Sequence, residues 1–126
     1  MNKKQQENNS AEKILHSIIE GIEEKKGTDI VKIDLTKIDY SECKYFIICQ
    51  GNSTVQAESI AQSVEETVEK ETGETAWHKD GYKNAIWILL DYGDVMVHVF
   101  QKDARKFYDL ETLWADATIE KIEIEN

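Results

Sequence analysis

The chain has 126 residues, of which 40% are hydrophobic and 32% are charged, and its formal net charge at pH 7 is −10. This length and balance are typical of one globular domain. No apolar run approaches the roughly 18 residues that cross a membrane. The N-terminal residues are polar and lack the apolar segment of a secretory signal. The sequence therefore predicts a cytoplasmic protein without a membrane segment.

The excess of acidic residues excludes an electrostatic nucleic-acid binder. A protein that holds phosphates displaces counterions with Lys and Arg, but 25 acidic residues outnumber 15 basic ones here. An acidic surface instead attracts a basic protein partner.

The two cysteines are expected to be free, buried thiols. Cys43 and Cys49 lie around one predicted strand, which sets them about 20 Å apart, beyond disulfide reach. The chain has no Cys-x-x-Cys pair, which argues against a zinc site.

The first part of the chain predicts a helix and two strands. Residues 1–9 predict a flexible arm, and Ser10 is a candidate N-cap. The helix has an apolar stripe at helical spacing, formed by Ile14, Leu15, Ile18, Ile19 and Ile22. Gly27 is a candidate stop. Residues 30–35 alternate as a strand does, and the unbroken apolar run 45–49 predicts a central strand covered on both faces.

The middle of the chain predicts a second helix and a hairpin. Ser53 and Gln56 form a capping box. The apolar stripe of the helix consists of Ala57, Ile60, Ala61, Val64 and Val68. Residues 75–78 predict a short strand. The β-rich runs 85–90 and 95–100, joined by a Tyr-Gly-Asp turn, predict a hairpin.

The last predicted helix is capped by Asp103, and Arg105 and Asp109 form a favourable surface pair four residues apart. Its apolar stripe consists of Phe107, Leu110, Leu113 and Trp114. The acidic tail, residues 118–126, is compatible with a helix, an edge strand or disorder. The order of elements predicts an α/β fold with a mixed β-sheet of about five strands flanked by helices. A single domain over residues 10–117 would lie between the arm and the tail.

The turn Gly51-Asn52-Ser53 lies between a buried strand and a capped helix. A helix N-terminus attracts anions, but the sequence fits no phosphate-loop pattern, so the turn is interpreted as a helix cap. A similar turn opens the site of nucleotidyltransferases, whose chemistry needs two carboxylates on one strand face. No Asp-x-Asp or Asp-x-Glu pair occurs between Ser53 and Asp103, and Asp91 and Asp94 flank a turn. The missing carboxylates argue against such an enzyme.

Two further features allow more than one interpretation. His78 and His98, with Asp80 or Asp94, could bind a metal, but their spacing is uninformative, and no metal or cofactor is expected. Trp87 lies in a strand with apolar residues on both faces. It is a core residue, or a partner anchor if the protein's own helices cover only one face. The same two interpretations hold for the aromatic residues of the last helix, which are Phe107, Tyr108 and Trp114.

Several segments together carry a family resemblance. They are residues 87–100 (WILLDYGDVMVHVF), 105–114 (RKFYDLETLW), 29–34 (DIVKID) and 45–53 (YFIICQGNS). The second is similar to a closing R-x-x-Y-x-L-E-x-L-W helix. In this combination the chain resembles the ribosomal silencing factor family, also called the Iojap family, from about Ile14 to Ala117.

Two positions depart from the family pattern. Lys44 stands where the family usually has Asp, and the family's H-x-E-G appears as His78-Lys-Asp80-Gly81. Both departures concern the contact surface.

The resemblance implies a nucleotidyltransferase-like fold without its metal carboxylates, and a function that is not enzymatic. Family members bind the fourteenth ribosomal protein (uL-type) of the large subunit. From there they block joining of the small subunit, which represses translation or aids subunit assembly. The expected protein is therefore a monomer or weak homodimer without a cofactor. The alternative is a metal-dependent nucleotidyl or phosphoryl transferase that uses the Gly51–Ser53 turn.

The resemblance also implies site residues. Trp87 would be the central anchor, with Asp91, Asp94 and His98 on or beside the same docking face. Three residues of the last helix would frame that face or orient the helix itself. They are Arg105, Tyr108 and Glu111. Its remaining apolar residues, which are Leu110, Leu113 and Trp114, would pack in the core.

Overall fold

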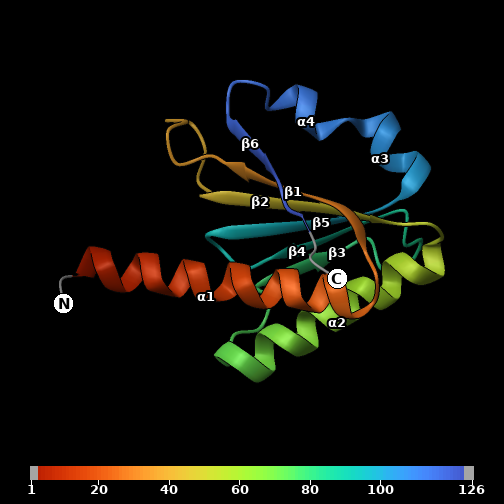
Figure 1. Ribbon diagram of the computed structural model, residues 1–126, viewed down its shortest axis with the longest axis horizontal. Helices are drawn as coiled ribbons and strands as arrows, with labels where there is room; N and C mark the ends of the chain where they lie inside the picture. The colour runs from red at the N-terminus through yellow and green to blue at the C-terminus, as the bar shows by residue number, and fades with distance from the viewer. Residues whose placement is uncertain (1–2, 124–126) are drawn as a thin grey trace.

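The computed structural model describes residues 3–123, and the side chains of residues 10–123 (Figure 1). The helices are α1 (Lys3–Glu24), α2 (Thr54–Thr72), α3 (Lys102–Tyr108) and α4 (Leu110–Leu113). The strands are β1 (Thr28–Asp34), β2 (Tyr45–Gly51), β3 (His78–Asp80), β4 (Trp87–Asp91), β5 (Val95–Gln101) and β6 (Thr118–Lys121).

The strands form one mixed sheet in the order β3-β4-β5-β2-β1-β6. β2 and β5 are parallel, from Tyr45 opposite Val95 to Gly51 opposite Gln101, and the other neighbours are antiparallel. The predicted mixed sheet and the β4–β5 hairpin are therefore confirmed. The expectation of about five strands is one short, because part of the acidic tail pairs with β1 as the edge strand β6.

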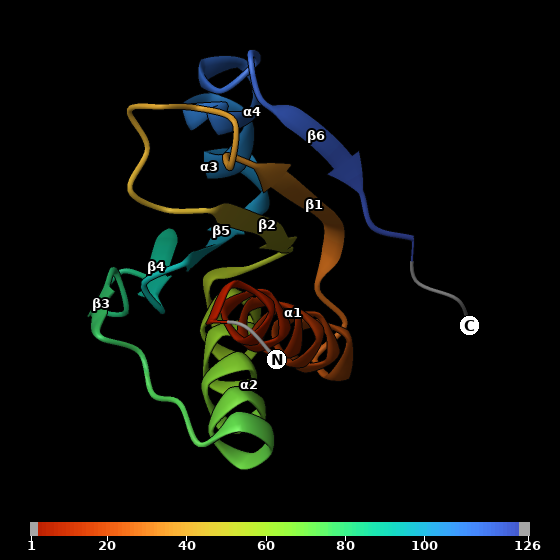
Figure 2. The same cartoon turned by 90° about the vertical axis from the view of Figure 1, so that its left-hand side faces the viewer.

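The sheet separates two unequal layers of helices. Figure 2 shows α1 and α2 together on one face and the short helices α3 and α4 on the other. The face toward α1 and α2 carries the larger core, in which Ile18, Ile47 and Val97 are fully buried. The opposite face carries a smaller core, centred on Ile33, Ile48 and Phe100.

The capping box at the start of α2 is confirmed. The Ser53 hydroxyl accepts a hydrogen bond from the backbone N–H of Gln56 at 3.1 Å. The Gln56 side chain in turn accepts from the backbone N–H of Asn52 at 2.7 Å. Its amide nitrogen also donates to the carbonyls of Lys25 and Lys26. One glutamine therefore fixes the start of α2 and the end of α1 together, and it uses the N–H group of Asn52 within the fold.

Two predicted boundaries in the first 80 residues are wrong. The first helix begins at Lys3 and not after Ser10, because residues 3–9 contain no Pro or Gly and include strong helix formers. The short strand predicted over residues 75–78 lies at His78–Asp80, where it pairs with β4.

The predicted last helix is divided in two. Asp109 adopts a left-handed conformation (φ 47°), so α3 ends at Tyr108 and α4 begins at Leu110. The predicted stripe no longer shares one face, and Phe107 and Leu113 are 81% and 74% exposed. The expectation that Leu113 packs in the core is therefore wrong, whereas Leu110 is buried.

The cap and the ion pair of this segment also differ from the prediction. The N-cap of α3 is Gln101, whose side-chain oxygen accepts from the N–H groups of Asp103 and Ala104, so Asp103 is not the cap. Arg105 is buried and pairs with Glu111 instead of forming a surface pair with Asp109. The kink at Asp109 explains this change, because it moves the residues that follow out of the helical register.

Both cysteines are free and buried, as predicted. Within residues 3–123, no helix is long and apolar enough to span a membrane.

Helices α1 and α2 approach each other closely at Gly21. A Cβ atom added there would lie 2.8 Å from the Cα of Val64 and 3.0 Å from the carbonyl oxygen of Ser63. The Ser63 hydroxyl donates to the Gly21 carbonyl at 2.7 Å, inside the packed interface. The two backbones are therefore in contact, and neither neighbour is a flexible side chain.

We expect Gly21→Ala to lower the free energy of unfolding by about 1–3 kcal/mol, the usual cost of overpacking. This is a strict test, because alanine alone would favour the helix by about 1 kcal/mol. Urea unfolding of both proteins measures the difference, with the exposed α2 variant Gln62→Ala as a control. A variant as stable as the wild type would show that the overpacking costs no more than the helix propensity that alanine gains.

Candidate functional site

Strand β4 divides its side chains between the two faces of the sheet. Ile88 and Leu90 point toward α1 and α2 and are fully buried. Trp87, Leu89 and Asp91 point to the other face, and all three are only half-buried. The doubly apolar strand therefore has one face inside the larger core and one face that α3 and α4 cover incompletely.

This partly covered face carries a continuous row of rings, which we call the aromatic row. It consists of Tyr40, Trp114, Phe46, His98, Phe100, Trp87 and Tyr108. Trp87 lies toward one end of the row, with ring centroids 4.9 Å from both Phe100 and Tyr108. At the other end, Trp114 lies 5.6 Å from Phe46 and stacks on the exposed Tyr40 at 5.8 Å. Phe46, His98 and Phe100 are buried, so the accessible part of the row consists of Tyr40, Trp87, Tyr108 and Trp114. Exposed and half-buried aromatic side chains are typical of a protein-binding face.

His98 fixes the orientation of Trp87. The indole N–H of Trp87 donates to Nδ1 of His98 at 3.0 Å. Nδ1 is therefore an acceptor, and the neutral ring carries its proton on Nε2. Nε2 is buried, and no described residue forms a hydrogen bond with it. Burial lowers the pKa of His98 from 6.5 to about 4, because the rings around it cannot solvate an imidazolium.

Charged groups lie at the hairpin end of the same face. The Asp91 carboxylate accepts from the backbone N–H of Gly93 at 2.8 Å and so holds the turn. Asp94 pairs with Lys44 at 3.7 Å, and both side chains are partly exposed. Lys44 is one of the two departures from the family pattern, so this chain presents an ion pair at that position.

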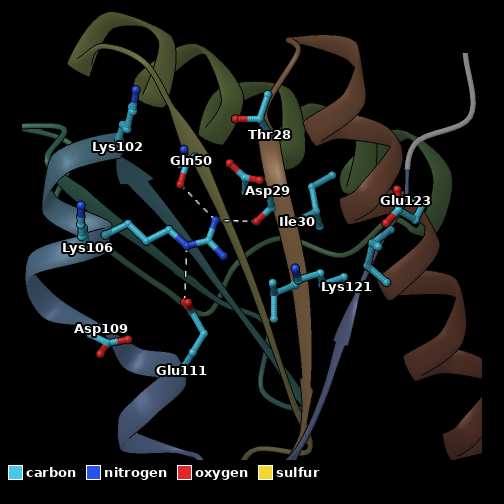
Figure 3. A pocket seen from close by; sticks show the side chains of 13 residues that line it. Thr28, Asp29, Ile30, Gln50, Lys102, Lys106, Asp109, Glu111, Lys121 and Glu123 are labelled. Atoms are coloured by element: carbon cyan, nitrogen blue, oxygen red, sulfur yellow. Dashed lines mark hydrogen bonds and ion pairs between the residues drawn. The ribbon is translucent and has the colours of Figure 1, made fainter.

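Two of the expected site residues lie apart from the aromatic row. Arg105 and Glu111 line a cavity between α3, β1 and β6, where they pair at 3.4 Å (Figure 3). Arg105 also donates to the carbonyl oxygen of Asp29 and to the side chain of Gln50. The fold therefore gathers Trp87, His98 and Tyr108, places Asp91 and Asp94 at the hairpin end, and separates Arg105 and Glu111.

Several residues of this face were missed by the sequence reasoning. Phe46 and Met96 are opposite each other in the parallel β2–β5 pair, and half-buried Leu89 lies opposite His98. Their period of two in the sequence was a signal that could have found them. Tyr40 lies in an irregular segment, where no periodicity could indicate its place.

No arrangement for metal binding is present in the part of the chain that the structure describes. Residues 3–123 contain no group of three or more His, Cys, Asp or Glu side chains that could hold an ion. His78 lies on the exposed strand β3, whereas His98 is enclosed by the aromatic row on the other side of β4.

The pKa of His98 predicts a pH-dependent stability. Between pH 6.5 and about 4 the unfolded chain binds a proton at this residue that the folded protein does not. The free energy of unfolding therefore falls as the pH drops through this range. We expect the stability advantage of wild type over His98→Asn to shrink by about 2 kcal/mol between pH 7 and pH 5.

Urea unfolding at the two pH values measures this difference. His78→Asn, on exposed β3, is the matched control for removing an imidazole from the unfolded chain. An advantage that stays constant with pH would show that His98 is protonated without cost in the folded protein.

Comparison with known proteins shows which family this chain resembles. Residues 8–126 match the family described as ribosomal silencing factor during starvation. The ribosomal silencing factor of Halalkalibacterium halodurans is 37% identical over 114 residues, which cover 90% of this chain and 96% of that protein. The Bacillus subtilis ribosomal silencing factor is 40% identical over 97 residues, or 77% of this chain and 80% of the relative.

A solved structure agrees with these relatives. The crystal structure of a Chromobacterium violaceum protein superimposes with a TM-score of 0.77 at 36% identity, covering 82% of this chain and 85% of that one. The match extends over nearly the whole chain in both sequence and structure. The chain therefore belongs to the ribosomal silencing factor family.

Proposed function

We propose that this protein is a ribosomal silencing factor that binds the large ribosomal subunit and blocks joining of the small subunit, which represses translation. The fourteenth ribosomal protein of the large subunit is the proposed partner. The observation that carries this proposal is the aromatic row, an apolar face left partly uncovered in a chain that belongs to this family.

Trp87 is the proposed anchor. Its indole N–H donates a hydrogen bond to His98, and its ring packs against the rings of Phe100 and Tyr108. A ring fixed in this way loses little conformational freedom on binding, and a rigid, half-buried aromatic residue is the usual kind of hot spot. Leu89 and Met96 extend the apolar contact along β4 and β5.

The charged residues have different proposed roles. Asp91 and Asp94, at the hairpin end, form the polar margin of the docking face, and Lys44 sets the local charge beside them. Arg105 and Glu111 do not contact the partner in this proposal and act by positioning other residues. Their pair ties α3 and α4 to β1 and β2, and so positions Tyr108 against Trp87.

The charge of the whole chain suits a basic protein partner on a surface rich in RNA. A net charge of −10 repels phosphate and favours approach to basic protein. Repression by this route is steric, so we propose a cytoplasmic binding protein, monomeric or weakly dimeric, that catalyses no reaction. Its fold would then correspond to a nucleotidyltransferase-like fold that lacks the metal carboxylates.

We expect Trp87→Ala to remain folded and to bind the large subunit about thirtyfold more weakly, since such an anchor contributes about 2 kcal/mol or more. Co-sedimentation with separated large and small subunits measures this, with wild type expected on the large subunit alone. Leu89→Glu is a second variant, because it places a charge on the same face without removing the Trp87–His98 hydrogen bond.

The matched control is Val55→Ala, which removes an exposed apolar side chain from α2 in the opposite layer. It should bind as the wild type does. Co-sedimentation of wild type with neither subunit would refute the proposal. Metal-dependent binding of a nucleoside triphosphate, measured by calorimetry, would then favour the transferase.

A further inference from the structure

The cavity beside Arg105 lies outside the aromatic row, and no residue of that row lines it. It has a volume of about 700 Å³ and lies between α3, β1 and the edge strand β6 (Figure 3). This size is in the range of small-molecule sites. Ile30, Val31 and Ile122 give it an apolar wall.

The guanidinium of Arg105 is the polar group at the inner end of this cavity. The side chain is only 9% exposed, and the dashed lines of Figure 3 mark its contacts with Glu111, Gln50 and Asp29. Those contacts use Nε and Nη1. Among the described residues, no hydrogen-bond acceptor is present for Nη2, although this nitrogen is not sealed from the cavity.

The chemistry of that nitrogen selects the complementary group. A guanidinium has only donors and keeps its charge at every physiological pH, so only an acceptor can satisfy Nη2. Lys102, Lys106 and Lys121 also line the cavity, and none of them forms an ion pair with another described residue.

Acidic residues line the cavity too, and they limit the affinity. Glu111 is engaged with Arg105, whereas Asp29, Asp109 and Glu123 are exposed to solvent. The inner end of the cavity has one donor group, Nη2 of Arg105, that has no acceptor among the described residues. The inner end therefore suits an anion, and the outer part tolerates a neutral or mixed-charge body.

We propose that this cavity binds a small organic oxyanion, a phosphate or carboxylate compound whose charged end accepts from Nη2 of Arg105. The flexible lysines at the rim close over that end. The remainder of the ligand lies against the wall formed by Ile30, Val31 and Ile122. The site is separate from the docking face, so occupancy and ribosome binding can be measured independently.

The test is a titration of the isotope-labelled full chain with inorganic phosphate, acetate and butyrate at constant ionic strength, followed by NMR. We expect saturable shifts at the amides of Asp29 and Gln50 and at Nε–H of Arg105, with the Trp87 indole N–H unchanged. Butyrate should bind more tightly than acetate, by up to about fourfold for each methylene that the wall buries. Phosphate saturating where acetate does not would assign the ligand to the phosphate class.

Variants at the rim avoid the risk that loss of Arg105 unfolds the protein. Lys106→Gln and Lys121→Gln should each weaken binding by about twofold to fivefold. Lys83→Gln, an exposed lysine outside the cavity, is the control and should change nothing. Shifts that are linear in concentration, or that chloride reproduces equally, would overturn the proposal.

Discussion

The parallel pairing of β2 with β5 is the constraint on which the rest of the structure depends. A parallel pair cannot be joined by a tight turn, so the chain must cross from the end of one strand to the start of the other. That crossing contains α2, which packs on the face already covered by α1. Both long helices therefore lie on one side. Among the described residues, the other side has only α3 and α4, of seven and four residues, and it remains partly open.

The open face is organised like an interface before any partner is present. Its rings are uncharged at neutral pH, because the imidazole of His98 stays neutral down to acidic pH. The charged groups Asp91, Asp94 and Lys44 lie at the hairpin end. An apolar centre with a polar margin is the usual anatomy of a protein–protein contact. In so acidic a chain, this arrangement also places the Asp91 and Asp94 carboxylates away from the Trp87–His98 hydrogen bond.

Most of the fold could be predicted from the sequence, because most of its helices and strands are encoded by patterns of neighbouring residues. The stripe of α1, the capping box at Ser53 and the hairpin around Gly93 all follow from patterns within a few residues. The division of the last helix could not be predicted in this way. It accompanies a buried Arg105, whose partners include Asp29, 76 positions away in the chain.

The site shows the same limit. The family resemblance indicated Trp87, His98 and Tyr108, which the fold brings together around one hydrogen bond and two ring contacts. It also indicated Arg105 and Glu111, but no local pattern reveals that they line the cavity beside β1 and lie apart from the aromatic row. Phe46 joins the aromatic row only through the register of β2 with β5, and pairing between distant strands is not contained in either strand alone.

The two buried cysteines have a practical consequence for studies of this protein. Burial raises the pKa of Cys43 to about 11 and that of Cys49 to about 12. Only about one molecule in ten thousand, or fewer, therefore carries a thiolate at either position at neutral pH, and the thiolate is the reactive form. We therefore expect the native chain to react very slowly with maleimides. A single cysteine introduced on the surface would accept a fluorophore or cross-linker selectively, without removal of the native pair.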